Sequence, residues 1–315
     1  MEKKVILYGA GNVGKASYQF LKHLGARSSI YAFCDRNAEI IKQIDSVPVM
    51  TFDEAKKVEG AVFLITVWPQ EPFFYEIKEL LETSNVTYYE DLFGDFCFAM
   101  GWDRVKIYRE YCAFMHSGTR GTYYDYAEGD FFVNKFWGEA SPFPEFFERL
   151  NLERVIELAC GHGRHVPKYI ERAGHVTLVD ILKENIQFCQ ERFSQYDKVS
   201  YYKNNGFDFS ELSDESYTAL FTYDAMVHFE LIDIYNYLKE TYRVLEHGGR
   251  ALFHHSNYHD DYKASFESSS HGRSFMSKDV FAYLAFRAGL EVEEQKIITW
   301  GNCEKLDCIT LVYKK

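Results

Sequence analysis

The stretch Arg154-Val-Ile-Glu157-Leu-Ala-Cys-Gly161-His-Gly163 sets an apolar run directly before a loop that contains two glycines. A short run of aliphatic residues predicts a buried strand. The glycines predict a sharp turn, because glycine adopts backbone conformations that other residues avoid. The residues after Gly163 are expected to form a helix, which completes the strand, glycine loop and helix of an α/β fold.

The segments after this loop keep alternating between strand and helix patterns. Strands are expected at 175–179, 199–202, 220–223 and 250–254, and a helix is expected over 233–245. Strands that alternate with helices of this length predict a mostly parallel sheet with helices packed on its faces.

Two acids at strand ends narrow the choice of ligand. Glu157 suits a cationic cofactor that carries no phosphate, and Asp180 can accept hydrogen bonds from both hydroxyls of a ribose. A turn at Glu246-His-Gly248-Gly249 then precedes the strand at 250–254. In this order the elements resemble those of the class I S-adenosylmethionine-dependent methyltransferases over about residues 134–315. The resemblance implies a seven-stranded sheet, S-adenosylmethionine as the cofactor and a final antiparallel hairpin.

The resemblance also implies where the cofactor lies. Gly161 and Gly163 are expected beside its methionine portion, Asp180 beside its ribose, and the turn 205–207 beside its adenine. The residues implied for cofactor binding are Glu157, Ala159, Gly161, Gly163, Asp180, Ile181, Asn205, Gly206, Phe207 and Tyr223. Ala159 departs from the family pattern, in which many members have glycine, and we expect it to narrow the pocket slightly.

Catalysis of methyl transfer needs alignment first, and a base when the acceptor must lose a proton. His228 follows the strand 220–223 on the side where the family places its substrate, and its ordinary pKa near about 6.5 suits a base at neutral pH. Asp224 lies four residues earlier and could orient the imidazole; the alternative is a capping Asp224 and a packed His228. His255 is the second candidate base. Adjacent residues of a strand face opposite sides, so only one of His254 and His255 can reach the site directly.

Acceptor binding is expected from three further residues. Tyr124 and Trp137 could stack on cofactor or substrate, although packing alone would also explain them. Arg273 follows a polar stretch that resembles the acceptor loop of small-molecule methyltransferases, and its guanidinium could bind an anionic acceptor or form a surface ion pair. No carboxylate trio accompanies His228, His254 or His255, so we expect no metal.

A second glycine loop lies at the beginning of the chain, where an apolar run over 4–8 precedes Gly9-Ala-Gly11-Asn-Val-Gly14. A helix over 15–24 and a strand over 29–34 are expected next, and Asp35 ends that strand. This is the context of a dinucleotide-binding turn, in which Gly9, Gly11 and Gly14 approach a phosphate and Asp35 binds a ribose. The alternative is that the glycines only let the helix pack on the sheet. The segment also resembles loosely the nucleotide- or sugar-nucleotide-binding domains attached to bacterial glycan-modifying enzymes.

The fold class predicted for the chain is α/β, with two Rossmann-like three-layer domains. An N-terminal domain is expected over 1–92, a helical, aromatic-rich connector or lid over 93–150, and a methyltransferase domain with a seven-stranded sheet over 151–315. A chain of 315 residues is long enough for about two such domains.

Composition excludes several classes of partner. The net charge of -12, with no dense Lys/Arg stripe, disfavours nucleic acid. No apolar run is long enough for membrane insertion, and no signal peptide is evident, so a cytoplasmic location is expected. The seven scattered cysteines are expected to be reduced thiols.

Methyl transfer to a small-molecule or sugar-linked acceptor is the function that these patterns favour, with O-methylation and surface-polysaccharide biosynthesis as the expected setting. Two alternatives stay open for the N-terminal domain. It binds NAD(P) or a nucleotide sugar and performs redox chemistry, or it is a non-catalytic interaction module, for example one that forms a homo-oligomer.

Overall fold

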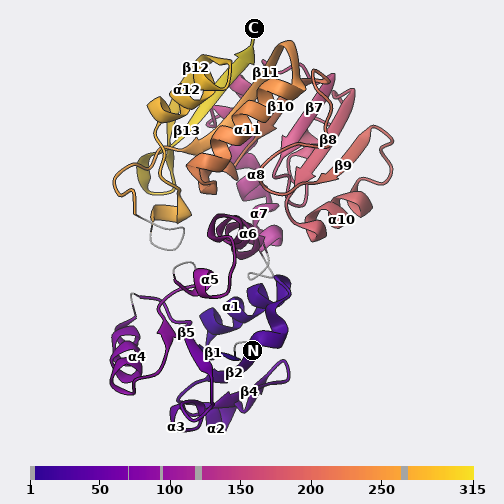
Figure 1. The fold of residues 1–315 in the computed structure, drawn as a ribbon. Coiled ribbons are helices and arrows are strands. Elements are labelled where there is room, and N and C mark those ends of the chain that lie inside the picture. Colours follow the sequence, from indigo (N-terminus) through magenta and orange to yellow (C-terminus); the bar gives the residue numbers. More distant parts are fainter. Residues whose placement is uncertain (1–3, 70, 93–94, 118–122, 264–268) are drawn as a thin grey trace. The chain divides into compact units, whose positions relative to one another are not determined.

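The structure is a computed structural model that describes residues 4–69, 71–92, 95–117, 123–263 and 269–315. It divides into two compact units, Met1–Met115 and His116–Lys315 (Figure 1). Parts of the predicted connector (93–94 and 118–122) and Ser268 of the predicted acceptor loop lie outside the described residues. The boundaries expected at 92 and 150 stay predictions.

The first unit is built around a six-stranded sheet with the order β3-β4-β2-β1-β5-β6. Its strands are β1 (Lys4–Tyr8), β2 (Ile30–Cys34), β3 (Gln43–Ile44), β4 (Val47–Met50), β5 (Ala61–Ile65) and β6 (Tyr88–Tyr89). Its helices are α1 (Asn12–His23), α2 (Ala38–Ile41), α3 (Phe52–Ala55), α4 (Pro72–Thr83) and α5 (Asp95–Ala99). Among the strands described in this unit, only the short β3 pairs antiparallel, with β4, and the other pairs are parallel.

The second unit is built around a seven-stranded sheet with the order β12-β13-β11-β10-β7-β8-β9. The strands are β7 (Arg154–Leu158), β8 (His175–Asp180), β9 (Val199–Lys203), β10 (Tyr217–Thr222), β11 (Leu245–Ser256), β12 (Leu290–Trp300) and β13 (Cys303–Lys314). β13 runs antiparallel to both β11 and β12, and the remaining pairs are parallel. The predicted α/β class and the seven-stranded sheet with its final hairpin are confirmed.

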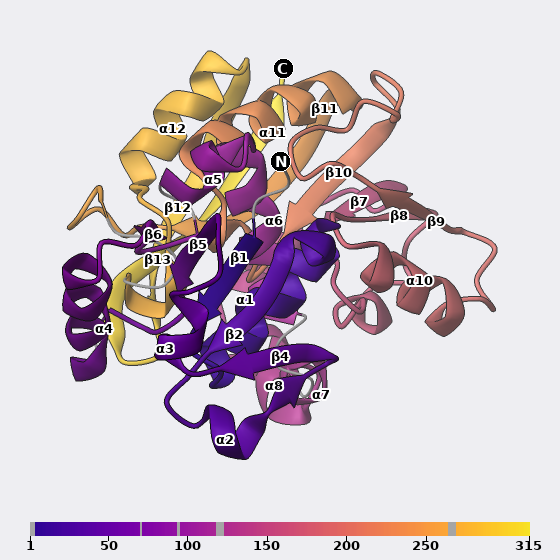
Figure 2. The same cartoon turned by 60° about the horizontal axis from the view of Figure 1, so that its bottom comes forward.

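Helices cover both faces of this sheet. On one face α8 (Asp130–Trp137), α9 (Phe143–Phe147) and α10 (Lys183–Arg192) contribute to a core with rings such as Phe143, Phe147 and Phe221. On the other face α11 (Leu231–Val244) and α12 (Lys278–Arg287) pack over Leu220 and Phe253. Figures 1 and 2 both show α11 and α12 side by side on this face. The apolar strands are therefore buried on both sides, as their continuous hydrophobicity predicts.

The aromatic connector is helical, as expected. The described helices within 93–150 are α5, α6 (Arg104–Ser117), α7 (Tyr123–Ala127), α8 and α9. Phe136 is buried and Trp137 is partly buried against the core of the second unit. Within the described ranges, no helix is both long and apolar enough to cross a membrane.

The helix predicted directly after Gly163 is only a short turn in the structure. The chain forms only a 3-10 turn, Val166–Lys168, and continues in turns to Gly174. Pro167 lies in this turn and has no backbone N–H to donate to a helical hydrogen bond. Gly174 ends the segment against Glu153, whose carbonyl oxygen would lie 2.5 Å from a Cβ added there.

Candidate functional site

The site lies where the direction of the second sheet reverses. β7 and β10 are neighbours, but the chain leads from β7 outward to β8 and β9, and from β10 outward to β11 on the opposite side. Open α/β sheets bind ligands at the carboxyl ends of the strands at such a point. Here these ends lead into the glycine loop after Leu158 and into Tyr223 and Asp224 after Thr222.

The glycine loop contains three residues in the left-handed region. Their φ angles are 57° at Ala159, 56° at Gly161 and 74° at Gly163. A Cβ added at Gly163 would lie 2.5 Å from the ring of Phe193, so the packing there also requires glycine. The departure at Ala159 therefore places an L side chain in a conformation that glycine adopts without cost.

Asp180 ties the loop to the end of β8. Its Oδ2 accepts a 2.9 Å hydrogen bond from the backbone N–H of Gly161, and its Oδ1 accepts from the N–H of Leu182 and from Asn185 Nδ2. Burial raises the pKa of this carboxyl group, and these hydrogen bonds work in the opposite direction. Ile181, which lies between Asp180 and Leu182 in the chain, is half-buried. The carboxylate predicted to bind a ribose is thus beside the predicted glycine loop.

Glu157 is more deeply buried than a strand-end acid in contact with solvent. Its side chain is 2% exposed, and its Oε2 accepts a 2.6 Å hydrogen bond from the hydroxyl of Tyr169. Burial raises the pKa of Glu157 to about 7, although the hydrogen bond from Tyr169 lowers it. A nearby cation would favour the charged form.

The turn predicted to border an adenine follows β9. Asn205 Oδ1 accepts hydrogen bonds from the N–H groups of Phe207 and Asp208, and Gly206 has a φ of 76°. The side chain of Asn205 is exposed, whereas Phe207 is half-buried. Asn205 therefore shapes this turn, and its contact with a base stays a prediction.

An ion pair spans the crevice between the two halves of the sheet. Arg164, from the glycine loop, donates a 2.7 Å hydrogen bond from Nη2 to Oδ2 of Asp224, which follows β10. The two side chains are 12% and 11% exposed, so the pair is largely but not fully buried. Asp224 has a φ of 58°, a conformation that costs an L residue roughly 1 kcal/mol or more.

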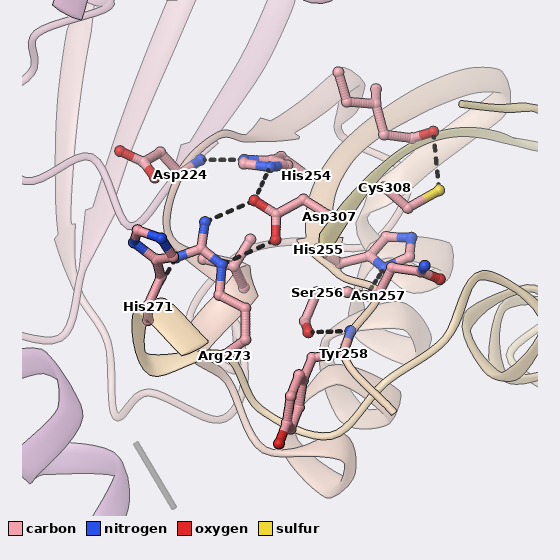
Figure 3. Close-up of polar contacts among 12 residues, drawn as sticks. Asp224, His254, His255, Ser256, Asn257, Tyr258, His271, Arg273, Asp307 and Cys308 are labelled. Carbon is pink, nitrogen blue, oxygen red and sulfur yellow. Dashed lines mark hydrogen bonds and ion pairs between the residues drawn. The ribbon is translucent and has the colours of Figure 1, made fainter. Parts of the chain in front are cut away.

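A hydrogen-bonded network of three buried side chains, His254, Asp307 and Arg273, leads to the backbone of Asp224 (Figure 3). The N–H of Asp224 donates to Nδ1 of His254, so this neutral imidazole carries its proton on Nε2 and donates it to Asp307. Arg273 donates hydrogen bonds to both oxygens of Asp307, at 2.9 and 2.6 Å. Its third nitrogen, Nη1, donates to the carbonyl oxygen of His271. Burial raises the pKa of Asp307, but the hydrogen bonds from Arg273 and His254 outweigh it and lower the pKa to about 2.

All three guanidinium nitrogens of Arg273 donate hydrogen bonds within the protein. The side chain is 3% exposed, and Asp307 is completely buried. Contact of Arg273 with an anionic acceptor stays a prediction, and the surface ion pair considered as its alternative is replaced by a buried one.

The two neighbouring histidines of β11 face opposite sides of the sheet. The ring of His254 stacks on Tyr223, with centroids 4.5 Å apart, whereas that of His255 stacks on Phe281 at 3.8 Å. Both nitrogens of His255 are hydrogen-bonded, to Ser256 O and Thr310 Oγ1, and burial lowers its pKa to about 3. A base role for His255 stays a prediction.

His228 lies in a 3-10 turn, Met226–His228, which begins two residues after Asp224 in the chain. Its Nδ1 lies 2.7 Å from the carbonyl oxygen of Gly272, which can only accept, so Nδ1 carries the proton of the neutral ring and Nε2 holds the lone pair. The structure pairs the carboxylate of Asp224 with Arg164, a partner that the sequence did not suggest. A base role for His228 stays a prediction.

The two connector aromatics differ in their surroundings. Tyr124 stacks on His162 of the glycine loop, with centroids 3.5 Å apart and planes at 14°. Trp137 donates from Nε1 to Nδ1 of His165 at 3.0 Å and packs against Phe143. Tyr124 thus lies at the glycine loop, and Trp137 is part of the packing beneath it.

In the first unit, packing alone explains two of the glycines. A Cβ at Gly14 would lie 1.8 Å from the carbonyl oxygen of Gly9, and a Cβ at Gly9 would lie 2.8 Å from that of Thr66. Around Gly11 a Cβ would meet nothing within 4 Å. Asp35 accepts a 2.8 Å hydrogen bond from the N–H of Ala10, which matches the contact between Asp180 and Gly161 in the second unit.

Several site residues were missed by the sequence analysis. Arg164 and Asn185 carry no recognisable motif, because their partners are distant in sequence. Asp307 gave a usable signal, since it is a single acid inside the apolar strand Leu306-Asp-Cys-Ile-Thr-Leu-Val. A charge within a buried strand indicates a buried partner. Among the described residues, no group of three or more His, Cys, Asp or Glu side chains could hold a metal ion.

Comparison with protein families matches residues 155–249 to a family described as a methyltransferase domain. This match runs from β7 to Gly249, which the structure places within strand β11 and not in the expected turn, and so includes the glycine loop, Asp180 and Asp224. A search of curated proteins gave no match.

Three solved structures are reported as similar to this chain. An S-adenosylmethionine-dependent methyltransferase from Mesorhizobium loti is 14% identical, with 56% of this chain and 99% of that chain covered and a TM-score of 0.45. The PH0226 protein from Pyrococcus horikoshii is 18% identical, with 64% and 96% covered and a TM-score of 0.46. Geranyl diphosphate C-methyltransferase from Streptomyces coelicolor, in complex with Mg2+, geranyl diphosphate and S-adenosyl-L-homocysteine, is 14% identical, with 60% and 85% covered and a TM-score of 0.46.

Proposed function

Because the C-terminal part of this chain is a class I S-adenosylmethionine-dependent methyltransferase domain, we propose that it methylates a hydroxyl group of a small-molecule acceptor. The observation that carries the proposal is the ion pair between Arg164 and Asp224. It joins the loop of β7, on the cofactor side, to the loop of β10, on the side left for an acceptor.

The residues present fit S-adenosylmethionine. The glycine loop has the left-handed turns that let a ligand approach its backbone, and Asp180 lies at hydrogen-bonding distance from Gly161. Asp180 and Asn185 would hold the ribose, and the turn 205–207 would border the adenine. When bound, the cofactor supplies an electrophilic methyl group on a sulfonium.

The role proposed for the crevice is to orient the acceptor. Asp224 accepts a hydrogen bond from a second hydroxyl of the acceptor, next to the one that is methylated, and Arg164 donates to a neighbouring oxygen of the same molecule. This pairing of donor and acceptor suits a polyhydroxylated compound such as a sugar. His228, whose Nε2 holds the lone pair, is the base proposed to remove the hydroxyl proton.

The wider setting of the proposal is the modification of a sugar or glycan precursor, for which the loose resemblance of residues 1–92 is the support. In that setting the first unit binds a nucleotide-linked acceptor or assembles the enzyme. The redox alternative requires a nicotinamide cofactor. Titration of the full chain with NADH tests it, and saturable binding that Asp35→Ala abolishes would favour it.

The direct test is a screen for S-adenosylhomocysteine formation by the full chain with sugars, phosphorylated sugars and nucleotide sugars. We expect turnover with at least one hydroxylated acceptor, and we expect Asp224→Asn to lower it while S-adenosylmethionine still binds. Turnover on an amine or carbon acceptor alone would overturn the proposed hydroxyl chemistry.

A further inference from the structure

The connector contacts the cofactor loop through a stack of three rings. Tyr124 of α7 lies on His162 of the glycine loop at 3.5 Å, and His162 lies on Phe188 of α10 at 3.8 Å, with interplanar angles of 14° and 12°. The stack therefore ties together three elements that are far apart in sequence.

Tyr124 also reaches the carboxylate proposed to bind the ribose. Its hydroxyl donates a 2.9 Å hydrogen bond to Asn185 Oδ1, and Asn185 Nδ2 donates to Asp180 at 3.0 Å. The ring covers Gly161, because a Cβ added at Gly161 would lie 3.1 Å from Tyr124 Cε1. No ligand atom fits between the Cα of Gly161 and the ring on this side.

Glu128 makes a second contact one helical turn later. Its N–H donates to the carbonyl of Tyr124, so both side chains leave the same side of the turn. Its Oε2 accepts a 2.7 Å hydrogen bond from Arg192 of α10, and the same nitrogen of Arg192 donates to the carbonyl of His162 at 2.8 Å. The connector is thus held at the glycine loop and at α10.

We propose that Tyr124 and Glu128 form a latch that closes the cofactor site of the free protein and has to open before the cofactor binds. The inference rests on the proposed use of Gly161 and Asp180 by S-adenosylmethionine. A cofactor that contacts both residues needs the space now filled by the ring and hydroxyl of Tyr124. Binding therefore selects the open form, and the affinity measured is the intrinsic affinity reduced by the fraction of molecules that are open.

The experiment uses the full chain and S-adenosylhomocysteine, so no acceptor is needed. Calorimetry gives Kd and stopped-flow fluorescence gives the association rate. We expect Tyr124→Ala to lower Kd about 5- to 10-fold and to speed association, because the open fraction rises. Tyr124→Phe, which keeps the ring but loses the bond to Asn185, and Glu128→Gln should shift both quantities in the same direction by less.

Tyr126→Ala is the matched control. It removes the same kind of side chain from the same helix, but Tyr126 is 66% exposed and its ring contacts Phe132. We expect the wild-type Kd and association rate from this variant.

Three outcomes would overturn the proposal in distinguishable ways. Weaker binding by Tyr124→Ala and Tyr124→Phe would make Tyr124 a cofactor contact. Unchanged binding in Tyr124→Phe and Glu128→Gln would remove the latch but leave the cofactor site. A wild-type chain that binds neither S-adenosylhomocysteine nor S-adenosylmethionine would overturn the cofactor assignment as well. If Tyr124→Ala does not fold, the two milder variants decide.

Discussion

The hydroxyl of Tyr169 donates a 2.6 Å hydrogen bond to Oε2 of Glu157, inside the core and at the start of the glycine loop. The contact gives a buried carboxyl group one strong partner, which is less than a fully charged carboxylate requires. The pKa of Glu157 accordingly rises from 4.5 to about 7. The side chain therefore changes its charge near neutral pH, next to the residues that we assign to the cofactor.

This shift predicts a loss of stability as the pH rises. The folded pKa lies above the unfolded one, so the folded state keeps a proton that the unfolded state releases, and stability falls between about pH 4.5 and about pH 7. The shift corresponds to about 3 kcal/mol. We expect Glu157→Gln to remove this part of the pH dependence of the melting temperature. The transition to follow is the one that S-adenosylhomocysteine shifts. Glu184→Gln, at an exposed position, is the control, and parallel pH profiles for wild type and Glu157→Gln would contradict the prediction.

Ala159→Gly should stabilise the protein. Ala159 has a φ of 57°, which costs an L residue roughly 1–2 kcal/mol, and glycine removes this cost at the expense of a more flexible unfolded chain. The expected net gain is up to about 1 kcal/mol, measured as a rise in the melting temperature. Ala219→Gly, within β10, should lower the melting temperature instead. A decrease in both variants would show that the turn does not strain Ala159.

Asp307→Leu and Arg273→Leu should each be strongly destabilising, and the double variant less so than their sum. Each single change leaves one buried charge without its partner, which costs about 3–5 kcal/mol. Urea denaturation of the four chains gives the coupling energy. If Arg273 instead binds an acceptor, as the sequence suggested, Arg273→Lys should raise KM for the acceptor found in the screen and leave stability nearly unchanged.

Asp224→Asn should separate catalysis from cofactor binding. The change keeps the shape of the side chain but removes the charge that faces Arg164, so we expect kcat to fall about 100-fold or more. The Kd of S-adenosylhomocysteine should stay within about threefold, since Asp180 and the glycine loop are untouched. Full turnover by Asp224→Asn, with loss in His228→Asn, would transfer the essential role to His228.

The seven-stranded sheet was expected only from the family resemblance, whereas the sequence by itself determined the alternation of strands and helices and the position of the glycine loop. These follow from local information, because apolar runs, glycines that need a positive φ and acids at strand ends lie within a few residues of each other. The short turn after Gly163 was the exception: Pro167 is a local signal against a helix that the sequence analysis did not use, and the packing of Gly174 against Glu153 is not a local property.

Only the tertiary structure decided the partners of the charged side chains. Arg164 faces Asp224, Arg273 is buried against Asp307, and Tyr124 lies over Gly161, in each case across tens of residues of sequence. No periodicity or motif encodes such pairs, because they depend on which strand ends and connector helices meet once the sheet has formed. The loop that opened the sequence analysis is therefore fixed in its shape by its own glycines and in its accessibility by a distant tyrosine.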